Sequence, residues 1–191
     1  MATQTFTAGQ ILTAAQLTTL QSNSGLQHIT GASFSAATSV SLPNGTFSTA
    51  YDNYRIILTL TALTTDSTFT MRTRASGTDN SAVSYITAQG GPNVGSTFTY
   101  SVTNEASAWP AGESDATVLY SLVMDIMNPQ KTSITYMTGN YFYVNQARSN
   151  IFSIGGSGAV NNTTSYDSLS FISNQANSMT GKYQVYGYSI G

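Results

Sequence analysis

The stretch that decides the fold is Tyr54-Arg55-Ile56-Ile57-Leu58-Thr59-Leu60-Thr61-Ala62. One face of it is apolar and takes every second residue: Ile56, Leu58, Leu60 and Ala62. Thr59 and Thr61 point the other way. Successive side chains of a β-strand point to opposite sides, so this repeat predicts a half-buried strand.

The same alternation recurs along the chain, which predicts about ten short strands. The clearer segments are 69–73, 97–102, 133–137, 141–144, 152–154, 169–172 and 183–188, and weaker ones are 40–42 and 83–86. Residues 118–127 are more continuously apolar, which predicts a central strand covered on both faces.

Residues typical of turns separate these segments. They are Pro43-Asn44-Gly45, 77–80, Gly90-Gly91-Pro92, Asn128-Pro129, Gly139-Asn140 and Gly155-Gly156-Ser157-Gly158. Many short strands joined by tight turns indicate a mainly β protein, an antiparallel β-sandwich of jelly-roll type. We expect one β body over residues 26–191.

A short N-terminal helix precedes this body. In the segment 12–21, Thr13 is placed to cap the helix and Gln16 to complete a capping box, and Gly25 could end it after 22–24. A helix of about ten residues is unstable alone in water, so it must dock on something. We therefore expect residues 1–25 to form an anchoring arm. The apolar side chains expected to anchor it in an assembly are Phe6, Ile11, Leu12, Leu17 and Leu20.

Composition excludes several classes of function. Only 7% of the 191 residues are charged, the net charge is −2, and cysteine is absent, while Thr (29) and Ser (26) supply 55 residues. Without a basic cluster we expect no nucleic-acid partner, and without a long apolar stretch or a Sec signal we expect no membrane insertion. A single histidine and no cysteine argue against a zinc site, and we expect no metal and no cofactor.

Catalytic groups are sparse, so we expect no enzyme. His28 is the only imidazole, and an ordinary packing or surface role suits it better than a triad. Glu105, Glu113 and Asp115 lie in one polar stretch, and two of these carboxylates at a suitable separation could hydrolyse a glycan. Hydrolysis of host glycans therefore remains a third, less favoured hypothesis.

Trp109 lies in a polar stretch outside the alternating pattern. An exposed tryptophan there would make a contact for a sugar or a protein, with Glu105 and Glu113 as neighbours. The alternative, which we favour, is that the indole folds back and closes the end of the sandwich.

Three segments resemble structural proteins of bacteriophage virions. They are Phe6-Thr7-Ala8-Gly9-Gln10-Ile11-Leu12-Thr13-Ala14-Ala15-Gln16-Leu17, Phe47-Ser48-Thr49-Ala50-Tyr51-Asp52-Asn53-Tyr54-Arg55-Ile56-Ile57-Leu58 and Gly181-Lys182-Tyr183-Gln184-Val185-Tyr186-Gly187-Tyr188. The first is similar to a segment common at the start of such proteins, the second to the strand that opens their β body, and the third to their last strand.

The resemblance implies a protein located in the virion, whose partners are other tail or capsid proteins. Such proteins are usually oligomers, often homotrimers. We expect a short tail fibre whose arm sits in the tail and whose body reaches a host surface glycan or protein. The alternative is a capsid decoration (cement) protein that stabilises the head.

Overall fold

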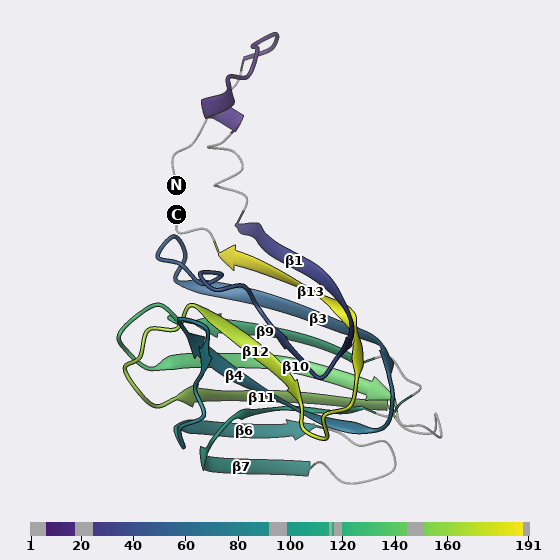
Figure 1. Ribbon diagram of the computed structural model, residues 1–191. Coiled ribbons are helices and arrows are strands. Elements are labelled where there is room, and N and C mark those ends of the chain that lie inside the picture. The colour runs from purple at the N-terminus through teal and green to yellow at the C-terminus, as the bar shows by residue number, and fades with distance from the viewer. Residues whose placement is uncertain are drawn as a thin grey trace.

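The computed structural model describes residues 7–17, 25–91, 99–114, 116, 120–144 and 151–188. Two antiparallel sheets pack face to face, as Figure 1 shows. The strands are β1 (Leu26–Ala37), β2 (Ser39–Ser41), β3 (Asn53–Leu63), β4 (Ser67–Ala75), β5 (Thr78–Asp79), β6 (Tyr85–Gly91), β7 (Thr99–Ala106), β8 (Trp109–Ser114), β9 (Tyr120–Met127), β10 (Thr135–Val144), β11 (Ile151–Val160), β12 (Ser168–Ser173) and β13 (Met179–Tyr188).

The larger sheet has eight strands in the order β1-β13-β3-β9-β10-β11-β6-β7, from top to bottom of Figure 1. The smaller sheet has the order β2-β12-β4-β5, and β8 lies beside β5 on the same edge of β4. All of these pairs are antiparallel, as expected from the short connections.

The connections are those of a jelly roll with two insertions. Four adjacent strands of the larger sheet, β1-β13-β3-β9, face four of the smaller one, β2-β12-β4-β8, and the chain crosses repeatedly between the two sets. The hairpin β6–β7 is inserted between β4 and β8, and the hairpin β10–β11 between β9 and β12. Both insertions widen the larger sheet. The predicted antiparallel sandwich is thus confirmed.

The core lies between the sheets and is rich in aromatic rings. Phe69 stacks on Phe171 at 5.0 Å between ring centroids and packs against Tyr120 at 5.1 Å. Tyr120 is fully buried and donates a hydrogen bond to the carbonyl of Ala111, and burial raises the pKa of its phenol far above the usual value. Such ring pairs add about 0.5–1.5 kcal/mol each beyond the burial of area.

The deciding stretch lies in β3, an interior strand of the larger sheet between β13 and β9. Ile56, Leu58 and Leu60 are buried, and their neighbours in sequence point to the outer face. Strand β9 lies beside β3, so its central position is confirmed. The prediction that β9 is covered on both faces is wrong, because buried and half-buried residues alternate along the strand and only one face is fully buried.

Two predicted turns are also wrong. Gly139-Asn140 lies within β10, and Gly155-Gly156-Ser157-Gly158 lies within β11, where every residue has a cross-strand partner. The lack of a side chain at Gly158 allows β11 and β6 to approach closely, because a Cβ there would lie 2.0 Å from the carbonyl oxygen of Ile86 on β6. Strand β1, which the sequence patterns did not predict, is one of the two edge strands of the larger sheet.

Candidate functional site

In the described part of the N-terminal arm, residues 7–17, the large apolar side chains are exposed. Residues 14–17 are helical, and the predicted capping box is confirmed. The backbone N–H of Gln16 donates to Oγ1 of Thr13 at 3.3 Å, and the N–H of Thr13 donates to Oε1 of Gln16 at 3.0 Å. Ile11 is 89% exposed, Leu17 51% and Leu12 38%. The other two anchor residues, Phe6 and Leu20, and the helix end at 22–24 lie outside the described residues.

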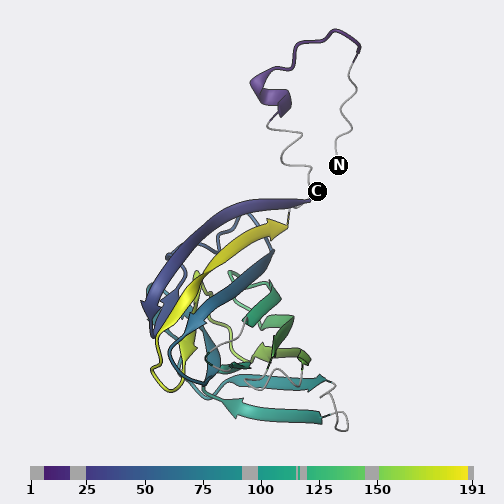
Figure 2. The ribbon, with the colours of Figure 1, turned by 90° about the vertical axis from the view of Figure 1, so that its right-hand side faces the viewer.

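The arm joins the body at one end of the sandwich, where β1 begins at Leu26. The strand registers place Tyr188, Asn53, Met127 and Thr135 at this same end. Figures 1 and 2 draw the described part of the arm, in purple, beyond this end and clear of both sheets. We call it the arm end.

The opposite end is marked by Ala37, Leu63, Tyr120, Val144 and Ile151. Strands β6 and β10 finish there, and β7, β9 and β11 begin there. We call it the far end. A body held by its arm would present the far end furthest from the point of attachment.

Trp109 is not an exposed platform. It opens β8, lies opposite Met71 of β4, and is only 4% exposed. Together with Met71, Leu122 and Met137 it lines a small apolar cavity in the core. The candidate surface contact at Trp109 is therefore wrong, and the indole fills the sandwich as the alternative interpretation expected. Pro110 is tolerated because β8 is an edge strand.

Glu113 is the one carboxylate of the predicted group whose side chain can be placed. It is exposed on β8 and accepts a hydrogen bond from the hydroxyl of Tyr143. Burial, with the nearby negative charge of Glu113, raises the pKa of Tyr141 to about 12. The side chain of Glu105 and residue Asp115 lie outside the described part, so no pair of carboxylates is assembled among the residues seen.

His28 lies exposed on β1, and its ring packs edge-on against Tyr186 of β13 at 5.4 Å. No group of three or more metal-ligating side chains gathers anywhere in the described ranges. Within those ranges there is also no helix long and apolar enough to span a bilayer.

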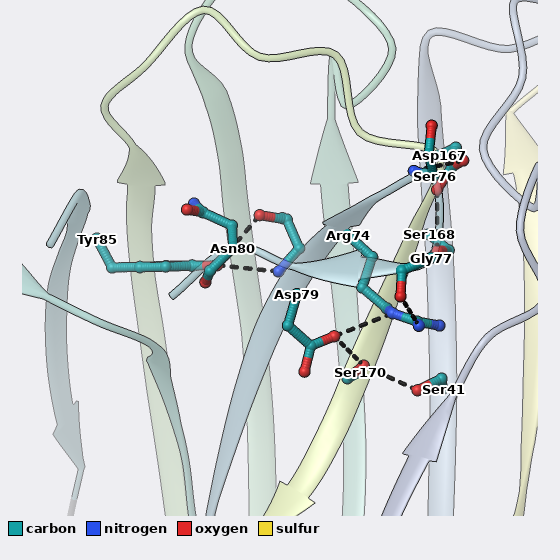
Figure 3. A network of polar contacts seen from close by, with 11 residues as sticks. Ser41, Arg74, Ser76, Gly77, Asp79, Asn80, Tyr85, Asp167, Ser168 and Ser170 are labelled. Carbon is teal, nitrogen blue, oxygen red and sulfur yellow. Dashed lines mark hydrogen bonds and ion pairs between the residues drawn. The ribbon is translucent and has the colours of Figure 1, made fainter. Parts of the chain in front are cut away.

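A polar cluster that the sequence did not reveal joins β2, β12, β4 and β5, as Figure 3 shows. Nε of Arg74 lies 2.9 Å from Oδ1 of Asp79, which also accepts a hydrogen bond from Ser170 at 2.7 Å. The hydroxyl of Ser170 lies 2.9 Å from that of Ser41. Asp79 is thus already engaged by a cation and a hydroxyl, which suits cross-strand stabilisation better than metal binding.

A second part of this cluster holds the β4–β5 turn. Asp167 accepts a hydrogen bond from the backbone N–H of Ser76 and one from the hydroxyl of Ser168, both at 3.1 Å (Figure 3). Ser76 and Gly77 both have positive φ, as a type I′ hairpin turn requires. The hydroxyl oxygen of Tyr85 accepts a hydrogen bond from the backbone N–H of Thr73 at 3.0 Å. These contacts tie β4, β6 and β12 together at the arm end.

The outer surface of three adjacent strands, β6, β11 and β10, carries no charged residue. We call it the uncharged face. Its outward residues are Ile86, Ala88 and Gly90 on β6, Ser153, Gly155, Ser157 and Ala159 on β11, and Tyr136, Thr138, Asn140 and Phe142 on β10. Phe142 is 49% exposed and Tyr136 47%. The glycine runs that were predicted as turns hid this face from sequence analysis.

An ion pair on the neighbouring strands is neutralised within the chain. Arg55 of β3 donates two hydrogen bonds to Asp125 of β9, at 2.9 and 2.8 Å, and Tyr188 of β13 donates a third at 2.7 Å. Burial alone would raise the pKa of Asp125, but these hydrogen bonds and the charge of Arg55 lower it. Burial and the contact with Asp125 raise the pKa of Tyr188 to about 12.

Comparison of the chain with protein-family models, with curated proteins and with solved structures finds no match.

Proposed function

We propose that the protein is a non-enzymatic structural component of a phage virion, a short tail fibre whose arm anchors it and whose body projects. The observation that carries this proposal is the arm itself. A capped helical turn exposes Ile11, Leu12 and Leu17 at one end of a rigid jelly roll. Exposed apolar side chains on a segment too short to be stable alone need a binding partner.

The position of the arm supports a projecting body. The arm leaves from the arm end, so a protein seated by its arm directs the far end outward. A host-contacting role belongs at the far end in this proposal. The resemblance of the three sequence segments to phage structural proteins supports the same assignment, and a homotrimer is the assembly we propose.

Capsid decoration is the second candidate, and the uncharged face favours it. A face without unpaired ions can be covered by a neighbouring capsid subunit without the cost of burying charge. The two candidates differ in copy number, which is a small multiple of three for a fibre and many times larger for a decoration protein.

Particle incorporation tests the anchor. The double variant Ile11→Ser and Leu17→Ser, like the deletion of residues 1–25, should fold normally but be lost from purified particles. The matched control is Val83→Ser, which removes a side chain 63% exposed on the body and should be incorporated like the wild type. Normal incorporation of the double variant would rule out the arm as the anchor.

A further inference from the structure

The uncharged face contains both a protruding ring and a hollow. Gly90 and Gly155 lie directly opposite each other on β6 and β11, and two side chains are thus missing from adjacent strands. Beside them, Ala88, Thr138 and Ser157 help to line an open depression of about 430 Å³. Phe142 stands on β10 one outward position along from Asn140, the cross-strand partner of Gly155. Ring and hollow are therefore separated by only about 7 Å along the strands.

Charge favours a partner that is itself neutral. The 27 residues of β6 (7), β10 (10) and β11 (10) contain no Asp, Glu, Lys or Arg. On β9, which adjoins β10, Asp125 is neutralised by Arg55 of β3. On β7, which adjoins β6, the side chain of Glu105 lies outside the described part. A partner that relied on charge would find no counterion on this surface, whereas an identical uncharged surface leaves no ion unpaired when both are buried.

The size of the surface suffices once β9 and β3 are included. With strands about 4.8 Å apart and about 3.4 Å per residue, the three strands of the uncharged face over eight residues cover roughly 14 Å by 27 Å, and adding β9 and β3, where Arg55 and Asp125 are paired, gives roughly 24 Å by 27 Å. This projects to about 650 Å², and the accessible area of a contoured surface is larger than its projection. A standard specific interface buries about 800 Å² on each partner.

The geometry points to the uncharged face as the contact between copies of this chain, with Phe142 of one copy seated in the hollow at Gly90 and Gly155 of the next. Ring and hollow lie on one face, so two copies that face each other across a two-fold axis can each seat Phe142 in the hollow of the other. This inference rests on the proposed function only in that the functional protein is an oligomer.

The mass in solution, by light scattering or analytical ultracentrifugation, tests the contact. We expect the wild type to have at least twice the chain mass of 20.2 kDa, and Ser157→Lys to associate at least ten-fold more weakly. Ser39→Lys is the matched control, since Ser39 is also an exposed strand residue but lies on β2 in the other sheet. It should associate like the wild type. A monomeric wild type, or equal masses for the two variants, would overturn the inference.

Two further variants keep the test sharp. Gly155→Val fills the hollow without adding charge. Its Cβ would lie 2.9 Å from Oδ1 of Asn140, a side chain that can rotate away, and at an ordinary contact distance of 3.9 Å from the carbonyl oxygen of Gly90. It should also weaken association at least ten-fold while its circular dichroism spectrum stays that of the wild type. Deletion of residues 1–25 should leave association intact. If the deletion instead abolishes association, the arm holds the copies together and the face does not. If the deleted protein still associates but is lost from particles, only the anchoring role of the arm is affected.

Discussion

The burial of Trp109 can be tested by replacing it with alanine. The side chain is 4% exposed and lies between the sheets beside an existing apolar cavity, so its removal enlarges that cavity. An indole of roughly 200 Å² at about 25 cal/mol per Å² is worth about 5 kcal/mol. Measured losses for buried aromatic residues replaced by alanine are about 3–5 kcal/mol.

We expect Trp109→Ala to lower the free energy of unfolding by about 3–5 kcal/mol. For a chain of this size the melting temperature should fall by about 6–20 °C, at 2–4 °C per kcal/mol. Urea denaturation followed by circular dichroism measures the loss, because Trp109 is the only tryptophan and its fluorescence disappears with it. In the wild type that fluorescence should be poorly quenched by iodide until the protein unfolds.

The control is Val83→Ala, which truncates an exposed side chain and should change stability by less than about 0.5 kcal/mol. If Trp109→Ala is as mild as this control, or iodide quenches the native fluorescence strongly, the indole is a surface group and the reasoning fails.

Two further predictions concern glycine and the ion pair. Gly158→Ala should destabilise the protein by about 1–3 kcal/mol in urea denaturation, because its Cβ would strike the backbone of β6. Gly156→Ala, whose Cβ would meet the flexible Gln89 at 3.2 Å, should cost much less, and equal losses would contradict the strand assignment. The pKa of Asp125 is lower in the folded protein than the usual 3.8, so its carboxylate stabilises the fold above that pH and the benefit is lost as pH falls through the folded pKa. Asp125→Asn should therefore lose less stability on acidification than the wild type, at a cost of about 1 kcal/mol or less near pH 7, and identical acid profiles would contradict the pairing.

The sequence predicts those parts of the fold that depend on local alternation. Strand β3 is recognised because Ile56, Leu58 and Leu60 repeat every second residue and point to one core. The capping box of Thr13 and Gln16 is recognised because both partners lie within one helical turn. Information of this kind is local, and it was sufficient to predict an antiparallel sandwich, although it missed the strands β1 and β8.

Features that depend on distant partners were not predictable. The glycines of β11 resemble a turn in sequence, and only the close approach of β6 explains Gly158. Burial of Trp109 was the favoured interpretation, but its place opposite Met71 depends on the pairing of β8 with β4, which no local pattern contains. The Asp79–Ser170 contact joins residues 91 positions apart, so no local pattern contains it.

The far end and the arm end illustrate the same limit. Which strand ends lie together follows from the registers of eight strands, and a sequence pattern gives no register. The arm was predicted from its capping box and the shortness of its helix, but its departure from one end of the sandwich became clear only from the pairing of β1 with β13.

The central claim, that the protein is a virion component carried as a short fibre, is tested most directly by quantitative mass spectrometry of purified particles. The account predicts that the intact chain is present at a small multiple of three copies per particle. A copy number many times larger would favour capsid decoration over the fibre, and absence of the chain from purified particles would contradict the claim.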